Sequence, residues 1–167
     1  MLIHWHPVLL TAIASTIQLG MIRNLQYLFF NVAMLNRWEK RYFEPELVSI
    51  VKHLEDGAVT TAMKELTISV DPKSYTHFAG IIYPLAVCEE WDALDSILVD
   101  RTPALQKVHI IVNVQNIDLP DLNAEFQLRM QMRLPRLARR GFLVAEFGSL
   151  EELRNIAWTR SWSNGRQ

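Results

Sequence analysis

Four short segments decide the fold, because each places apolar residues at its first, fourth and sixth positions. They read Leu25-Gln-Tyr-Leu28-Phe-Phe30, Met63-Lys-Glu-Leu66-Thr-Ile68, Leu105-Gln-Lys-Val108-His-Ile110 and Phe142-Leu-Val-Ala145-Glu-Phe147. Their starts at residues 25, 63, 105 and 142 are 38, 42 and 37 residues apart, which indicates an internal repeat. Apolar residues two apart are typical of β-strands, so the sequence predicts four strands joined by long spacers.

The spacers have the periodicity of amphipathic helices. Pro135 is expected to kink or shorten the third spacer helix, and Gly141 is expected to end it. Further helices are expected over residues 7–21 and from Ser149 through Ala157. The apolar residues lie three and four apart: Leu47, Ile50, Val51 and Leu54 in the first spacer, Trp91, Leu94 and Leu98 in the second, and Phe126, Met130, Leu134 and Leu137 in the third.

Strands that alternate with helices predict an α/β fold with a parallel sheet. A sheet covered by helices on both faces has nearly continuous apolar strands, whereas polar residues such as Glu65, Thr67 and His109 alternate with the apolar ones here. We therefore expect a short solenoid of about four parallel strands with its helices on one face and a solvated opposite face. The alternative is a doubly wound open sheet, with a ligand-binding or catalytic site near Asp71, Asn113 and Gly148 at the strand C-termini.

Composition indicates one globular domain over residues 1–167. The chain has 50% hydrophobic residues, 21% charged residues and a formal net charge of −1, which excludes a disordered chain and gives no general attraction to nucleic acid. The single cysteine, Cys88, excludes an intramolecular disulfide and predicts a cytoplasmic or nuclear protein. The uncharged residues 7–22 are fewer than the ~20 that span a bilayer, so no membrane insertion is expected.

The residues that often carry catalysis do not form a recognisable site in the sequence. His4 and His6 lack a third ligand at metal-binding spacing, and Cys88 precedes two acids that disfavour a thiolate. Asp92 and Asp95 are expected to be solvated, because the apolar stripe of their helix lies elsewhere. No glycine-rich phosphate loop or nucleophile elbow is present. The sequence thus predicts a non-enzymatic protein without metal or cofactor.

Polar and aromatic side chains on the outward face of the strands are the main candidates for binding a protein partner. Tyr27 and Phe29 have an alternative role, since N-terminal residues including Trp5 can cover them. A secondary candidate is a basic stripe of Arg129, Arg133, Arg136 and Arg140, which suits an acidic protein or solvent better than nucleic acid. The predicted partner-binding residues are Tyr27, Phe29, Glu65, Thr67, Lys107, His109 and Glu146.

The repeat resembles leucine-rich repeats, including Asp71 and Asn113 at the ninth position of two units. The segments Trp91-Asp-Ala-Leu-Asp-Ser-Ile-Leu98 and Leu134-Pro-Arg-Leu-Ala-Arg-Arg-Gly-Phe-Leu143 resemble the C-terminal repeats of fungal F-box-like proteins. That resemblance, over about residues 63–148, implies a surface for substrate recognition. An F-box segment is absent from this sequence, so a ligase-adaptor role is not implied. Repeat ends without polar caps lead us to expect a piece of a longer repeat protein or self-association through an exposed end.

Overall fold

A computed structural model describes residues 2–5, 25–33, 44–56, 62–72, 79–114 and 120–148. Its strands are β1 (Leu2–Trp5), β2 (Tyr27–Ala33), β3 (Glu65–Asp71), β4 (Lys107–Asn113) and β5 (Leu143–Gly148), and its helices are α2 (Glu44–Asp56), α3 (Ala79–Ala86), α4 (Glu90–Arg101), α5 (Pro120–Arg133) and α6 (Pro135–Arg139). The helices expected over residues 7–21 and from Ser149 lie outside the described residues, as does His6.

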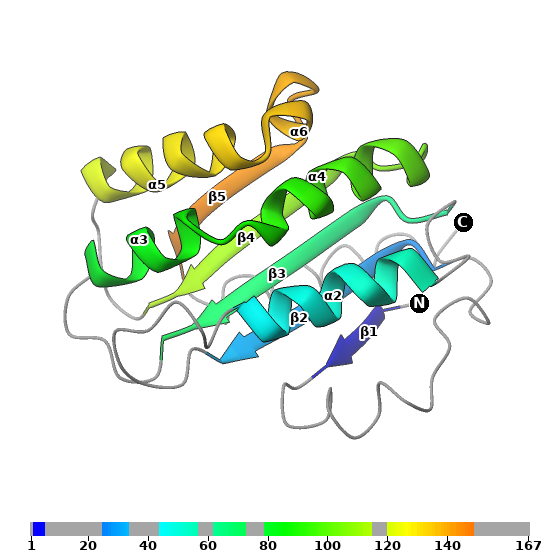
Figure 1. Ribbon diagram of the computed structural model, residues 1–167, viewed down its shortest axis with the longest axis horizontal. Coiled ribbons are helices and arrows are strands. Elements are labelled where there is room, and N and C mark those ends of the chain that lie inside the picture. Colours follow the sequence, from blue (N-terminus) through cyan, green and yellow to red (C-terminus); the bar gives the residue numbers. More distant parts are fainter. Residues whose placement is uncertain are drawn as a thin grey trace, which may run out of the picture.

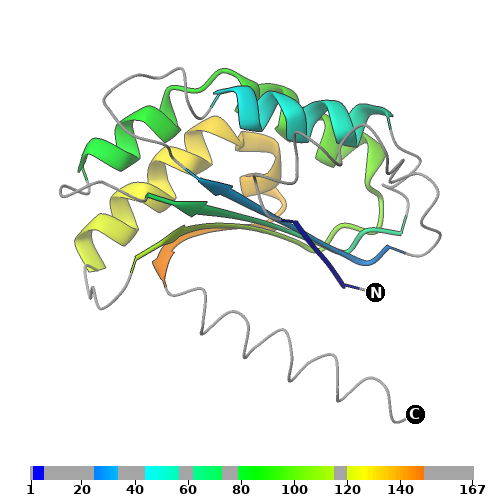
Figure 2. The ribbon, with the colours of Figure 1, turned by 90° about the horizontal axis from the view of Figure 1, so that it is seen from below.

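The strands form one parallel sheet in the order β1-β2-β3-β4-β5 (Figure 1). Helices α2 to α6 all lie on the same face of that sheet (Figure 2). We call the opposite side the far face. The chain therefore has the predicted α/β architecture with a parallel sheet. Because the order of the described strands never reverses, they lack the switch point that characterises a doubly wound sheet.

Strand β1 was not among the four predicted strands. It pairs with β2 from Leu2 opposite Tyr27 to Trp5 opposite Phe30. With four residues it is too short to show the first-fourth-sixth pattern, and only a neighbouring strand identifies it. The described part of the chain therefore has five strands, one more than the predicted number of about four.

The apolar positions of the four segments point into one core between the sheet and the helices. The central row across the strands is Phe30, Ile68, Ile110 and Ala145, and all four side chains are at most 3% exposed. The helices contribute the apolar stripes that the spacers predicted, including the fully buried Trp91 and Phe126. This confirms which side chains of the strands face inward.

The register of the fourth segment differs from the prediction by two residues. The repeat pattern places Ala145 opposite Val108, whereas the structure pairs Leu143 with Val108 and Ala145 with Ile110. A shift of two leaves every side chain on the same face because strands have a period of two. Consequently the ninth position of this unit is Gly148, opposite Asn113.

The third spacer helix is interrupted as Pro135 predicted. Helix α5 ends at Arg133 and α6 begins at Pro135. Gly141, with a φ of 71°, ends α6: its N–H donates to Ala138 O at 3.0 Å, and Phe142 N–H donates to Leu137 O at 3.2 Å. These two bonds define a Schellman motif, in which glycine tolerates the left-handed conformation.

The starts of neighbouring strands repeat the same main-chain contacts. Lys64 and Glu65 donate their N–H groups to Gln26 O at 2.8 and 3.0 Å, and Gln106 and Lys107 donate theirs to Lys64 O at 2.8 and 3.1 Å. The geometry of one unit thus recurs at the next unit. Among the described helices, none is long and apolar enough to cross a membrane.

Candidate functional site

All seven predicted partner-binding residues lie on the far face. Since Leu28, Leu66 and Val108 point into the core, strand alternation directs their sequence neighbours to the other side. Two rows of the sheet result from the register: Tyr27, Glu65 and Lys107 in the first, and Phe29, Thr67 and His109 in the second, with Glu146 beyond them on β5. The structure therefore assembles one surface from residues up to 119 positions apart.

This surface is exposed at its margin and buried at its centre. Tyr27, Glu65 and Lys107 are half-buried, whereas Ser69, Ile111 and His109 are 0%, 1% and 4% exposed. The expectation of a solvated far face is therefore wrong for its central residues. His109 is also in contact with the side chain of Glu146.

His109 and Glu146 form a hydrogen-bonded pair on this face. His109 Nε2 lies 2.8 Å from Glu146 Oε1, and the Glu146 side chain is 46% exposed. Burial lowers the pKa of the imidazole below its ordinary value, and Lys107 lowers it further, while Glu146 and Glu65 partly oppose this effect. Because a carboxylate only accepts, Nε2 carries the proton that joins the two side chains.

A histidine beside a carboxylate is also part of hydrolytic triads, which need a hydroxyl bonded to the other ring nitrogen. Thr67 is the cross-strand neighbour of His109, but the structure gives no hydrogen bond between these two side chains. Within the described ranges, moreover, no group of three or more His, Cys, Asp or Glu side chains is placed to hold a metal ion. Cys88 is buried and its Sγ lies 2.9 Å from Glu90 Oε2.

The predicted basic stripe is occupied by contacts within the molecule. Arg129 Nε donates to Glu125 Oε1 at 2.9 Å, and Arg133 Nε donates to Ala86 O. Arg136 NH1 donates to Asp100 Oδ2 at 3.0 Å. The break between α5 and α6 also divides the stripe, so its arginines do not form one continuous free surface. Arg140 is exposed just after α6.

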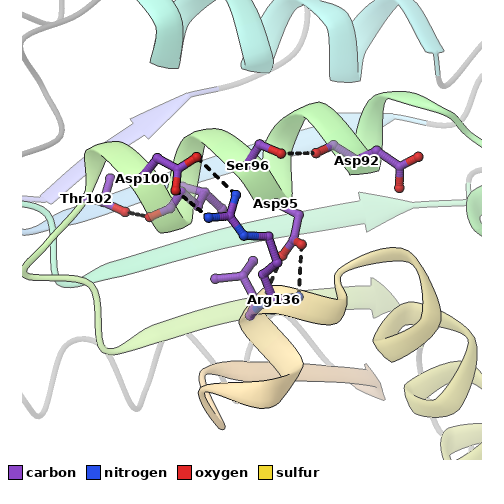
Figure 3. A network of polar contacts seen from close by, with 8 residues as sticks. Asp92, Asp95, Ser96, Asp100, Thr102 and Arg136 are labelled. Atoms are coloured by element: carbon purple, nitrogen blue, oxygen red, sulfur yellow. Dashed lines mark hydrogen bonds and ion pairs between the residues drawn. The ribbon is translucent and has the colours of Figure 1, made fainter.

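Asp95 differs from its predicted solvated state: it is 2% exposed and joins α4 to α6 (Figure 3). Its Oδ2 accepts Arg136 N–H at 3.0 Å and its Oδ1 accepts Leu137 N–H at 2.9 Å. These are donors of the first turn of α6, which lack helical partners. Asp92, by contrast, is exposed as predicted.

A sequence signal for the buried carboxylate existed in the spacing. Asp95 follows Trp91 by four residues and Leu94 by one, which places it on the apolar side of α4. Its partners lie 41 and 42 residues away, however, so only the folded chain shows why an acid is tolerated there. Asp95 is a structural residue of the helical layer, because it satisfies main-chain donors and points away from the far face.

The predicted alternative site falls at the C-terminal ends of the strands. Asp71 ends β3, Asn113 ends β4 and Gly148 ends β5, with Asn113 paired to Gly148. Gly148 is closely packed, because a Cβ added to it would lie 3.1 Å from Ile111 Cδ1. Since the described strands follow in order, these ends do not flank the crevice that an open sheet forms where its order reverses.

Comparisons with known proteins give the chain no relative. No protein-family model matches it, and neither a curated protein nor a solved structure matches it. Function is therefore inferred from the geometry of the far face.

Proposed function

We propose that this chain is a non-enzymatic repeat scaffold of leucine-rich-repeat character that binds a protein partner through its far face. The observation that carries the proposal is the gathering of seven polar and aromatic residues, predicted from sequence alone, in neighbouring rows of one face. Recognition of a substrate within an F-box-like protein is the biological form of this proposal that the sequence resemblance favours.

The repeat character is supported by three features of the described residues. The parallel strands follow one another in sequence order, the helices lie on one face, and the main-chain contacts at Gln26 recur at Lys64. Stacked units that each contact only their neighbours have this arrangement in solenoids. Such a scaffold leaves the margin of the far face, where Tyr27, Glu65 and Lys107 are half-buried, available for residues that are not needed for the core.

The first row of the far face indicates the chemistry of the partner. It places an aromatic ring, an acid and a base side by side in Tyr27, Glu65 and Lys107. Aromatic anchors and charges of both signs are common at protein interfaces, where complementary charges set the orientation of the partner. The surface thus favours a folded protein or peptide with its own charges of both signs over a polyanion.

Paired charge reversals on the two faces test this function. Lys107→Glu changes the first row of the far face, and Lys52→Glu makes the same change at an exposed position of α2. We expect capture of the partner from native extract to fall about tenfold or more with Lys107→Glu, as for loss of an interface charge pair, and to stay unchanged with Lys52→Glu.

A second pair of variants addresses the aromatic part of the surface. Tyr27→Ala removes a ring of the far face, and Tyr83→Ala removes the 57% exposed ring of α3. Equal capture by both tyrosine variants, together with equal capture by both lysine variants, would show that partners do not use the far face. Circular dichroism of each variant verifies that the fold is intact.

A further inference from the structure

The edge of the sheet at β5 is covered by side-chain amides from helix α5. Ala145 N–H donates to Gln127 Oε1 at 2.5 Å, and Phe147 N–H donates to Asn123 Oδ1 at 2.6 Å. Gln127 Nε2 donates in turn to Leu143 O at 3.4 Å. Asn123 and Gln127, which we call the edge cap, therefore contact the main chain of three alternate residues, Leu143, Ala145 and Phe147.

These main-chain groups are the ones that face away from β4. Val108 N–H donates to Phe142 O at 2.8 Å and Val114 N–H donates to Gly148 O at 3.0 Å, so the even-numbered residues of β5 bond to β4. In a strand the groups of alternate residues point to opposite sides. The main-chain groups of residues 143, 145 and 147 consequently point to the outer side of β5, where another strand would pair.

Two side-chain amides of α5 can reach the β5 main chain because the distance between them along the helix matches the distance between alternate residues of the strand. Four residues of an α-helix rise about 6 Å, and two residues of a strand advance about 6.6 Å. Asn123 and Gln127 are four apart, whereas their targets Phe147 and Ala145 are two apart. Phe126 keeps α5 at this rotation, because it is fully buried with its ring centroid 5.3 Å from that of Phe147.

We propose that the edge cap of Asn123 and Gln127 blocks the addition of a strand at β5, so that neither a second copy of this chain nor an extended peptide extends the sheet there. An unprotected strand edge is a template for pairing with other chains, and native proteins cover such edges. For this edge, the proposal is an alternative to the expectation of an exposed repeat end that self-associates. It is independent of the proposed function, since its test needs no partner.

Amide hydrogen exchange followed by NMR reads out each half of the edge cap. Gln127→Ala is expected to speed exchange at the Ala145 amide, and Asn123→Ala at the Phe147 amide, each roughly fivefold to tenfold, as for the loss of one hydrogen bond. The matched control is Gln131→Ala, which removes an exposed amide one helical turn further along α5 and leaves both rates unchanged. If a variant also speeds exchange at the β4 amides to the same extent, it has lost global stability. The change in exchange at the β5 amides is then corrected for the change at the β4 amides.

A measurement of self-association tests whether the edge cap prevents chains from pairing at β5. We expect the double variant Asn123→Ala/Gln127→Ala to show concentration-dependent dimers or larger species in sedimentation velocity, while the wild-type chain and Gln131→Ala show less. The variant Asn123→Asp keeps the acceptor oxygen for Phe147 N–H and leaves Gln127 unchanged, so it is expected to behave as the wild type. If the double variant folds and sediments as the wild type does, or if the single variants leave both amide rates unchanged, the proposal is wrong.

Discussion

The two faces of the sheet differ at successive residues of the same strand. On β4, Ile110 points into the core and is fully buried in a row of apolar side chains. His109, its neighbour, points to the far face and bonds to Glu146. The inward row is apolar from β2 to β5, whereas the outward row contains Phe29, Thr67 and His109.

This difference separates stability from recognition. The helix-covered face buries apolar side chains of β2 to β5, and such burial is the main favourable contribution to folding. Charged and aromatic residues of the far face are not needed for that core. Substitutions on the inward face should therefore unfold the chain, and substitutions at the margin of the far face should change binding first.

The largest effect is expected for Ile110→Ala on the inward face. Loss of the buried side chain leaves a cavity, which costs about 4 kcal/mol of unfolding free energy. Chemical denaturation followed by circular dichroism measures it. A cost below about 1 kcal/mol, typical of surface sites, would show that the inward row is not the core of the fold.

Asp95→Ala extends the comparison to a polar residue on the helical side. It leaves the N–H groups of Arg136 and Leu137 without their carboxylate, which we expect to cost about 2 kcal/mol. Asp92→Ala, at an exposed position of the same helix, is the control and should change the denaturation midpoint little. Equal midpoints for the two variants would contradict a structural role of the buried carboxylate.

The pH dependence of stability tests the buried centre of the far face. Because the pKa of His109 is lowered mainly by burial, the unfolded chain binds a proton more readily than the folded chain. The contribution of His109 to folding stability is therefore fully present above the ordinary histidine pKa of about 6.5. It is lost as the pH falls through the lower pKa of His109 in the folded chain. His109→Gln should lose less stability than the wild type between pH 7.5 and pH 5, measured as denaturation midpoints; parallel curves would refute this.

Lys107→Ala should give the smallest effect on stability. This half-buried residue lies at the margin of the far face, and surface substitutions of this kind change the unfolding free energy by less than about 0.5 kcal/mol. The same variant should weaken capture of the partner. A loss of stability as large as that of Asp95→Ala would mean that the margin of the far face is part of the core.

The elements that local periodicity determines were predictable from the sequence. Apolar residues two apart identified β2 to β5 and their inward side, and Pro135 and Gly141 marked the interruption and the end of the third spacer helix. Strand β1 was missed because four residues contain too little pattern. The two-residue register shift of β5 was missed because either register buries the same side chains, and only pairing with β4 distinguishes them.

The sequence by itself therefore determined the α/β class, the parallel strands and the set of residues on each face, since these depend on spacing along the chain. Tertiary structure alone decided the order of the strands, the burial of His109, the partners of Asp95, and the contacts of Asn123 and Gln127 with β5. The hydrogen bonds among these features join residues between 16 and 42 positions apart in sequence. Local propensity carries no information about such partners, because hydrogen bonds and burial are set by the distances that exist once the chain has folded.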